Sequence, residues 1–311
     1  MGCTLTYRLA AQGKQVTLLE RVRLGHGASG VPVALLNPYR GRSARASPYD
    51  LEALAVMWPL VDELEALGLV TGVRRSGVLR IASNAKGAKT WQKREGVRWL
   101  WPEDIPDSYH APFGGFLVPT GGWLEPALWL RALADAAEQK GATLIENCAV
   151  TQVTGGQPDG FELRTPRETF RADTVILTSG SDRTLGQRAL ELEQVAGEVI
   201  GLGPTEHLPY PLAGAVYGAQ IDDTFFLGGN HRPANTPDES APRQLKRAGG
   251  WFIPSLREAS LASVWHGVRV KTGDNLPLVR TLQPGFLFVG ALAGRGFLCA
   301  AKVAASVAEA L

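Results

Sequence analysis

The sequence predicts an α/β fold: a parallel-sheet domain assembled from three separated segments, with a β-rich (α+β) domain formed by two inserts. Two observations support this prediction. Helix and strand patterns alternate at the beginning of the chain, again over residues 120–185, and at its end, while the segments between them look strand-rich and loop-rich. The 36 glycines and 20 prolines among 311 residues indicate many tight turns and close backbone approaches.

The first element is a helix over residues 3–11, which ends at a glycine, a residue that commonly follows a helix. Residues 14–20 follow as a strand whose letters VTLL suit burial in a parallel sheet. After a glycine-rich loop, Ser47 and Pro48 provide an N-cap and a first-turn proline for a long helix. The next residues, SGVLRIASN, alternate like a strand, and residues 87–122 read as loops and short strands.

The second half continues the alternation. A helix, EPALWLRALADAAEQKG, ends in glycine, and the strands ATLIENCAVTQVT, GFELRT and TFRADTVILTSG follow it. Residues 190–260 read as antiparallel and loop-rich, with a helix over QLKRAGGWFIPSL that is interrupted before Pro254. The tail is a strand, a glycine turn and a helix. These patterns give the domain limits: residues 1–70, 120–190 and 265–311 for the parallel-sheet domain, and residues 71–119 and 191–264 for the β-rich domain.

The composition indicates a globular protein. Hydrophobic residues make up 45% and charged residues 20% of the chain, as in proteins with a packed core. The net charge of +2 does not require a nucleic acid or a membrane surface as partner, and no apolar run approaches the roughly 20 residues that span a bilayer. Three distant cysteines, without a CxxC pair, indicate a reducing, cytoplasmic setting and no metal site.

The N-terminal segment contains the second half of a dinucleotide-binding fingerprint. In G-x-G-x-x-G, the third glycine lets the helix pack close to the strand, and an acid about 20 positions later binds the ribose. Gly2 and Glu20 stand in this register, so we expect the first strand and two glycines to lie before Met1, through a misplaced start or genuine loss. The alternatives are an ordinary helix and strand, or an N-myristoylation pattern in MGCTLT, which nothing polybasic supports.

Four further segments carry a family signature. The longest is VWHGVRVKTGDNLPLVRTLQPGFLFVGALAGRGFLCAAKVAASVAEAL; the others are GHGASGVPVALLNP, GGWLEPALWLRALADAAEQKGATLIENCAVTQV and TVILTSG. In this order they resemble the D-amino-acid oxidase (DAO) family of FAD-dependent oxidoreductases, over about the whole chain. The resemblance is closest in character to glycine oxidase and to the oxidase module of the bifunctional enzyme that modifies a tRNA wobble uridine. It implies an FAD/NAD(P)-binding Rossmann-like domain and non-covalent FAD.

The resemblance also implies which residues hold FAD. Gly2 would abut the pyrophosphate at a helix N-terminus, where free N–H groups favour anions, and Glu20 would bind the adenosine ribose. The N–H groups at the start of the last helix would face the flavin N1–C2=O edge. The other implied contacts are Arg21 beside the adenine; Ala28, Ser29 and Gly30 around the pyrophosphate and ribityl chain; Ala34 and Leu35 against the flavin ring; Val150 at the adenine; Ser179 and Gly180 beside the ribose; and Gly294, Arg295 and Gly296 before the last helix. For each glycine the alternative is turn chemistry alone.

Arg269 is the main substrate-binding candidate. By resemblance to the glycine-oxidase branch, its planar guanidinium would bind a substrate carboxylate as a fork, although valine replaces the family's following proline. Tyr217 would add a second contact from the insert. The alternatives are a structural arginine and a half-buried aromatic. Val268 lies near the position at which the sarcosine-oxidase branch links its flavin through cysteine, which favours non-covalent FAD. His231 and His266 are candidate proton acceptors that we do not assign to catalysis, and no catalytic residue is identified.

The resemblance therefore implies FAD-dependent oxidation of the C–N bond in an amino acid or N-substituted glycine, with hydride transfer to flavin N5 and molecular oxygen as acceptor. No strong acid or base is required if the amine arrives neutral. One alternative is the same chemistry on tRNA, for which Arg40, Arg42 and Arg45 offer a basic loop, although the small net charge does not favour RNA. Another is a non-catalytic flavin-fold remnant that binds a ligand or partner.

Overall fold

The computed structural model describes residues 1–41, 43–186, 190–233 and 236–311. Within these ranges the α-helices are α1 (Gly2–Ala11), α2 (Pro48–Ala66), α3 (Ala85–Trp91), α4 (Pro126–Gln139), α5 (Ala241–Phe252) and α6 (Gly296–Glu309). None of these helices is both long and apolar enough to cross a bilayer.

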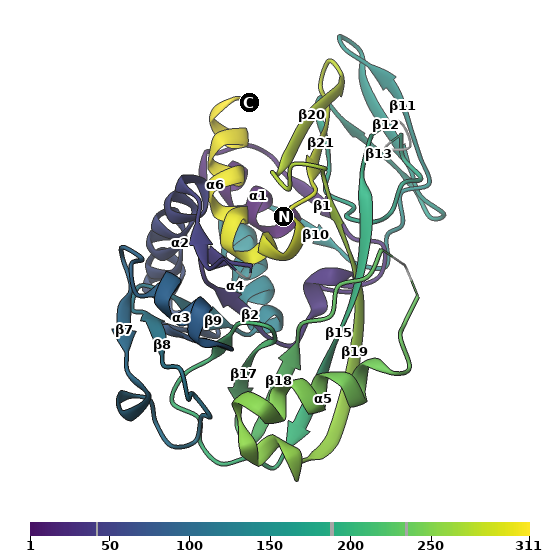
Figure 1. The fold of residues 1–311 in the computed structure, drawn as a ribbon. Helices are drawn as coiled ribbons and strands as arrows, with labels where there is room; N and C mark the ends of the chain where they lie inside the picture. The colour runs from purple at the N-terminus through teal and green to yellow at the C-terminus, as the bar shows by residue number, and fades with distance from the viewer. Residues whose placement is uncertain (42, 187–189, 234–235) are drawn as a thin grey trace.

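A mixed sheet of eight strands, in the order β19-β15-β18-β17-β16-β6-β8-β7, is the largest sheet in the described part of the chain. Its strands are β6 (Val78–Ile81), β7 (Arg98–Leu100), β8 (Gly115–Val118), β15 (Glu193–Gly203), β16 (Leu212–Ala213), β17 (Tyr217–Ile221), β18 (Thr224–Gly228) and β19 (Ser260–Lys271). The long strands β15 and β19 run antiparallel along one side of the molecule, and α5 packs against β15 and β18 (Figure 1).

The described residues also form five smaller sheets. They are β1 (Thr17–Leu19) with β10 (Thr143–Ile145); β14 (Val175–Leu177) with β21 (Phe286–Gly290) and β20 (Leu278–Gln283); β11 (Gln152–Gly156) with β12 (Gly160–Arg164) and β13 (Thr169–Ala172); β2 (Ala34–Leu36) with β9 (Gly122–Leu124) and β5 (Val73–Arg74); and β3 (Tyr39–Arg40) with β4 (Arg45–Ala46).

The two parallel pairs, β1–β10 and β14–β21, are the framework of a doubly wound sheet. Gly2, the first residue of α1, lies between them: a Cβ on Gly2 would lie 2.9 Å from Thr178 Oγ1 and 3.3 Å from Leu18 Cδ1. In the described part of the chain, no strand pairs with the second edge of β1 or of β14.

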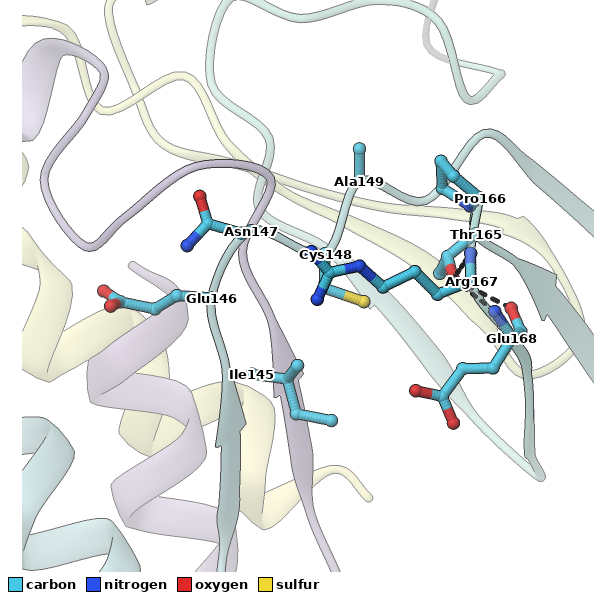
Figure 2. Close-up of a pocket in the computed structure, with 9 residues that line it drawn as sticks. All are labelled: Ile145, Glu146, Asn147, Cys148, Ala149, Thr165, Pro166, Arg167 and Glu168. Carbon is cyan, nitrogen blue, oxygen red and sulfur yellow. Dashed lines mark hydrogen bonds between the residues drawn. The ribbon is translucent and has the colours of Figure 1, made fainter.

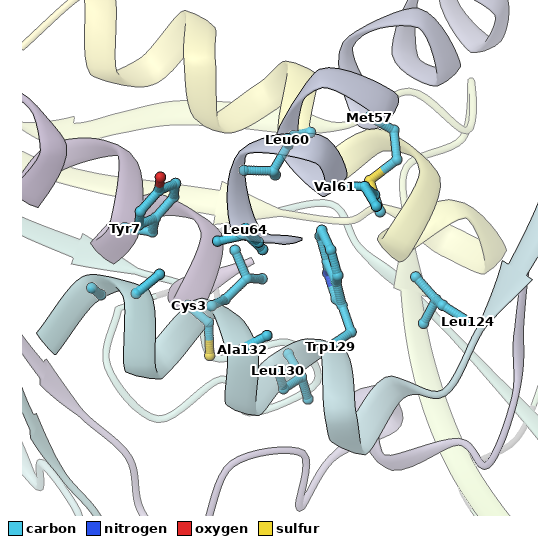
Figure 3. Packing of buried hydrophobic residues seen from close by; sticks show 14 of the residues in the cluster. Cys3, Tyr7, Met57, Leu60, Val61, Leu64, Leu124, Trp129, Leu130 and Ala132 are labelled. Atoms are coloured by element: carbon cyan, nitrogen blue, oxygen red, sulfur yellow. The ribbon is translucent and has the colours of Figure 1, made fainter. Parts of the chain in front are cut away.

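One apolar core joins α1, α2, α4 and α6 (Figure 3). Met57, Leu60 and Leu64 of α2 are fully buried, and their spacing of three and four residues places them on one helix face. Trp129 of α4 packs in the same cluster, and burying each large side chain of this kind contributes about 1.5–3 kcal/mol. At the rim, Tyr7 Oη of α1 donates a 2.6 Å hydrogen bond to Glu63 Oε1. This packing fixes the helix that begins at Gly2.

The predicted α/β fold class is confirmed, with local differences. Helix α2 begins where the sequence predicts, and Ser47 Oγ caps it by accepting a 3.1 Å hydrogen bond from the Asp50 N–H. The prediction of loops and short strands after residue 87 is wrong at α3, where the Asn84 side chain caps a short helix by accepting from the Gly87 N–H at 2.8 Å. Strand β19 runs through the limit predicted between residues 264 and 265.

Candidate active site

Strand β19 carries three residues on one face because side chains alternate along a strand. Trp265, Gly267 and Arg269 occupy this face. The Trp265 ring covers Gly267, where an added Cβ would lie 2.1 Å from the ring. The indole Nε1 lies 3.8 Å from the position of a Cβ on Gly30. Glycine at 267 therefore leaves room for the tryptophan to reach toward the loop at Gly30.

Arg269 is held between three segments. Its Nη2 lies 2.7 Å from His231 Nδ1, in the segment that follows β18. A Cβ on Gly197 of β15 would lie 2.7 Å from Nη2, and a Cβ on Gly294 would lie 3.4 Å from Nη1. The two glycines leave space for the guanidinium. His231 is exposed at the surface, but the protein around its ring desolvates it, and this desolvation, followed by the positive charge of Arg269, lowers the pKa of His231 to about 4.

Tyr217 lies within the electrostatic reach of Arg269. Tyr217 lies on β17 and pairs with Gly228 of the neighbouring strand β18, where an added Cβ would lie 2.8 Å from the Tyr217 hydroxyl. Burial raises the pKa of Tyr217, and the positive charge of Arg269 opposes that rise. The phenol is thus a protonated hydrogen-bond donor at neutral pH.

The turn between β21 and α6 brings Gly294 to Arg269. Ala291 and Ala293 adopt φ values of 57° and 52° on either side of Leu292, in a left-handed region that residues other than glycine rarely occupy. Such backbone strain concentrates at functional sites. Gly296 then starts α6, whose N-terminal N–H groups lie beside this turn.

The Arg295 side chain points away from this turn, into a buried ion cluster. Its Nη1 donates a 2.8 Å hydrogen bond to Asp50 Oδ1 at the start of α2. Arg40 Nη2 and Ser47 Oγ bind the other carboxylate oxygen at 2.8 Å and 2.6 Å. Arg295 therefore ties the turn to α2 through its side chain. Arg45 is exposed, and Arg42 lies outside the described residues.

The predicted nucleotide-binding residues gather where β1 and β14 end. The Glu20 carboxylate accepts a 3.1 Å hydrogen bond from the Val22 N–H, and Arg21 Nη1 lies 2.6 Å from Asp182 Oδ2, at the turn after β14. Ser179 and Gly180 form this turn; the Ser179 hydroxyl donates to the Asp182 carbonyl at 3.1 Å, and Gly180 has a φ of 60°. Val150 lies two residues after Cys148, whose N–H donates a 2.9 Å hydrogen bond to the Glu20 carbonyl.

Two further predicted segments contact the elements that carry the candidate site residues. Residues Ala28–Gly30 form a 3-10 turn that packs against β19 and α4. A Cβ on Gly30 would lie only 2.1 Å from the Gly25 carbonyl oxygen, so the loop requires glycine there. Ala34 and Leu35 begin β2, which packs against both α6 and β17. Strand β2 thus contacts the helix that follows Gly294 and the strand that carries Tyr217.

A separate surface pocket lies at the end of β10, against the turn between β12 and β13 (Figure 2). Glu146 in this pocket accepts a 2.7 Å hydrogen bond from the Leu24 N–H, and Thr165 closes the turn by accepting from the N–H groups of Arg167 and Glu168. The predicted site residues do not line it. We therefore place the candidate site at Arg269.

Sequence reasoning assigned no role to Asp50 or Trp265, and it named His231 only as a candidate proton acceptor. The contacts of Asp50 with Arg295 and of His231 with Arg269 join residues far apart along the chain, so no motif spacing indicates them. Only the run VWHGVRV gave a signal, and it drew attention to Arg269 rather than to the tryptophan. Among the described residues, no cluster of His, Cys, Asp and Glu side chains is arranged to hold a metal ion.

The parallel strand pairs and the helix that begins at Gly2 are those of a Rossmann-like, dinucleotide-binding α/β fold. The chain belongs to the DAO family of FAD-dependent oxidoreductases, whose profile, described as FAD dependent oxidoreductase, matches residues 1–310. The predicted family is therefore confirmed.

Individual relatives agree with this membership. The chain is 24% identical over 304 residues to glycine oxidase of Geobacillus kaustophilus, covering 89% of this chain and 80% of that protein. It is 26% identical over 313 residues to the tRNA 5-methylaminomethyl-2-thiouridine biosynthesis bifunctional protein MnmC of Burkholderia multivorans, covering 92% of this chain but only 42% of that protein's length.

Solved structures show the same fold. The crystal structure of glycine oxidase from Geobacillus kaustophilus superposes with a TM-score of 0.86 at 23% identity, over 99% of this chain and 90% of that one. L-proline dehydrogenase from P. horikoshii superposes with a TM-score of 0.83 at 18% identity, over 99% and 89% of the two chains.

Proposed function

We propose that the protein oxidises the C–N bond of an amino acid or N-substituted glycine, with molecular oxygen as the final acceptor. The observation that carries this proposal is the position of the Arg269 guanidinium beside Gly294, with Nη1 3.4 Å from the place of a Cβ on that glycine. FAD, when bound, supplies the acceptor for the hydride that leaves the carbon beside the amine. The chain's own residues bind and orient the substrate.

The residues present fit a dinucleotide at the predicted positions. Gly2 stands at the position of the third fingerprint glycine, which lets the helix pack close to the strand. A Cβ on Gly2 would lie 2.9 Å from Thr178 Oγ1, so a larger residue would prevent this packing. The α6 N-terminus offers N–H groups that favour an anionic edge. Val268 is aliphatic and forms no covalent bond to a flavin. These features support non-covalent FAD held by the predicted cofactor residues.

Arg269 would bind the substrate carboxylate, because a guanidinium offers parallel N–H groups that match two carboxylate oxygens. The Tyr217 hydroxyl would donate to the same carboxylate from β17. Holding the carboxylate fixes the carbon beside the amine with respect to the turn at Gly294. Because no strong base is needed once the amine is neutral, positioning is the main contribution of these side chains.

The second candidate is oxidation of the side chain of a tRNA wobble uridine. The match to the bifunctional tRNA-modifying protein, over 92% of this chain, favours it. The modest net charge of +2 opposes tight RNA binding by this chain alone. A third reading, a non-catalytic flavin-fold protein, predicts no reduction of bound flavin by any amine.

The test is anaerobic flavin reduction by the FAD-loaded protein. Glycine, N-alkyl glycines, a panel of L- and D-amino acids and an aminomethyl-uridine tRNA are compared by the loss of flavin absorbance. Reduction by small carboxylated amines is expected. Reduction by the tRNA alone would favour the second candidate, and reduction by none would contradict both. Acid precipitation is expected to leave FAD in the supernatant, which distinguishes non-covalent from covalent binding.

Substituting Gly30 with alanine is expected to weaken FAD binding at least about tenfold, because the added methyl group would lie 2.1 Å from the Gly25 carbonyl oxygen and must distort the loop. The matched control is Gly27→Ala. Gly27 has a φ of −83°, and a Cβ there would meet no atom within 4 Å. Titration of the apoprotein with FAD, followed by flavin fluorescence, gives both affinities. Equal affinities for the two variants would show that this loop does not hold the cofactor.

A further inference from the structure

His231 contacts Arg269 through a hydrogen bond whose direction is fixed by chemistry. Arg269 Nη2 and His231 Nδ1 are 2.7 Å apart. A guanidinium has no acceptor, so Arg269 donates and Nδ1 accepts. The imidazole is therefore neutral and carries its proton on Nε2. The pKa of about 4, lowered by desolvation of the ring and by the charge of Arg269, agrees with this state at neutral pH.

The residues on both sides of His231 are anchored to β15. Asn230 Oδ1 accepts a 2.9 Å hydrogen bond from the Glu198 N–H, and the Asn230 amide group donates to the Glu198 carboxylate. Arg232 Nη2 donates to Glu198 Oε1 at 3.2 Å, and the backbones of Arg232 and Ala196 bridge. The backbone on both sides of His231 is therefore attached to β15, and this attachment sets the position of His231.

The carboxylate that anchors this segment also holds β19. Glu198 is 2% exposed, and its Oε1 lies 3.0 Å from His266 Nδ1, three residues before Arg269. The Asp238 N–H donates to the same oxygen at 3.0 Å. Burial alone would raise the pKa of Glu198, but the hydrogen bonds from Asn230, His266 and their neighbours outweigh burial and lower the pKa below its usual value, so the group is ionised. Glu198 therefore joins the strand of Arg269 to the segment of His231.

We propose that His231 is a positioning residue, which holds the Arg269 guanidinium ready for the substrate carboxylate. This inference rests on the proposed binding of a carboxylate by Arg269. The bond to His231 occupies one N–H of Nη2 and leaves the other, with those of Nη1, for the substrate. A guanidinium fixed before binding loses less conformational freedom when the carboxylate arrives. The neutral ring adds this restraint without a second positive charge.

The first test compares three variants of the FAD-loaded protein. His231→Leu removes the acceptor and is expected to raise KM for carboxylated amines about tenfold, with kcat changed less than about twofold. His231→Asn places Oδ1 where Nδ1 stood and is expected to restore KM to within about threefold of the parent. His207→Leu, at an exposed histidine in the segment after β15, is the matched control and should leave both constants unchanged.

A second pair of variants tests the position of the Arg269 guanidinium from the side of β15. Gly197→Ala would place a methyl group 2.7 Å from Arg269 Nη2 and should raise KM in the same direction, whereas Gly214→Ala has no atom closer than 3.8 Å to its new methyl group. This pair keeps the His231 side chain, although the Gly197 methyl group would also lie 2.9 Å from the Asn230 carbonyl oxygen, so it tests the placement of Arg269 and its neighbouring segment even if the leucine variant folds poorly. Thermal unfolding of each variant is measured alongside.

The flavin-free protein provides a readout that does not depend on activity. The chain has five histidines, so NMR of ring-labelled histidine resolves few signals, and His231→Leu identifies the one from His231. Addition of acetate is expected to shift the His231 signal in the parent and not in Arg269→Met. If KM is unchanged in His231→Leu, or if acetate leaves the signal unmoved while activity depends on Arg269, the inference is overturned and the proposed function stands. If Arg269→Met has no effect, the proposed function fails.

Discussion

Replacing Arg269 with methionine is expected to lower kcat/KM for carboxylated amines by about 30- to 1000-fold, because binding worth about 2–4 kcal/mol is lost when a buried carboxylate loses its partner. The guanidinium lies between Gly197 and Gly294, in space that only glycines leave open. Lysine at this position keeps the charge but loses the fork, so it should raise KM more than it lowers kcat. Stopped-flow flavin reduction under anaerobic conditions measures both constants.

Two controls isolate the carboxylate. Arg280→Met removes an exposed arginine of β20 and should leave the kinetics unchanged. Amines without a carboxylate should respond little to either change at Arg269. If Arg269→Met reduces the flavin as fast as the parent with every carboxylated substrate, Arg269 does not bind the carboxylate.

Replacing Asp50 with alanine is expected to lower the free energy of unfolding by about 3–5 kcal/mol, because it leaves the Arg295 guanidinium buried without its partner. The side chains of Asp50 and Arg295 are 0% and 3% exposed, and their closest atoms are 2.8 Å apart. The same change releases the turn before α6 from α2. Urea denaturation at pH 7 measures the loss of stability.

The matched control for this cluster lies on the same helix. Glu52 pairs with Lys302 across the surface, with 64% of the Glu52 side chain exposed, so Glu52→Gln should cost no more than about 1 kcal/mol. Similar losses in the two variants would contradict the structural importance of the buried cluster.

The Asp50 cluster also predicts how stability depends on pH. Burial alone would raise the pKa of Asp50, but hydrogen bonds from Ser47 and Arg295 and the charge of Arg40 lower it below its usual value. A carboxyl with a lower pKa in the folded state contributes stability above its unfolded pKa of about 4, and this contribution is lost as the pH falls through the folded value. Below about pH 4, the parent should therefore lose stability more steeply than Asp50→Asn, as acid titrations of unfolding would reveal.

The parts of the fold that depend on local chemistry were predictable from the sequence. Ser47 and Pro48 predict the start of α2, because the N-cap and the first turn of a helix depend on only a few neighbouring residues. Helix α3 was missed, since its seven residues carry too short a periodic pattern to stand out beside the Trp- and Gly-rich residues that follow. The length of β19 was also not predictable, because its pairing partner β15 lies more than fifty residues earlier in the chain.

The candidate site likewise contains some relationships that the sequence could predict and some contacts that it could not. Arg269 and Gly294 stand in one continuous signature, so their relationship could be expected from the family resemblance. The contact between His231 and Arg269 joins residues 38 positions apart, and the one between Glu198 and His266 spans 68 positions. Neither follows a helical or strand period. Only the sheet register, which pairs Glu198 with His266, brings these groups together.

The continuous pairing of β15 and β19 affects how the site can open. A hinge requires a few residues that absorb large changes in φ and ψ. Along β19, pairing with β15 extends from Lys271 opposite Glu193 to Ser260 opposite Gly203, with one irregularity at Gly201–Leu202, far from Arg269. Within this pairing, β19 therefore offers no hinge beside Arg269. Lys271, at the end of β19, also bridges Leu292 in the turn before α6, so the paired strand continues directly to the turn that contains Gly294.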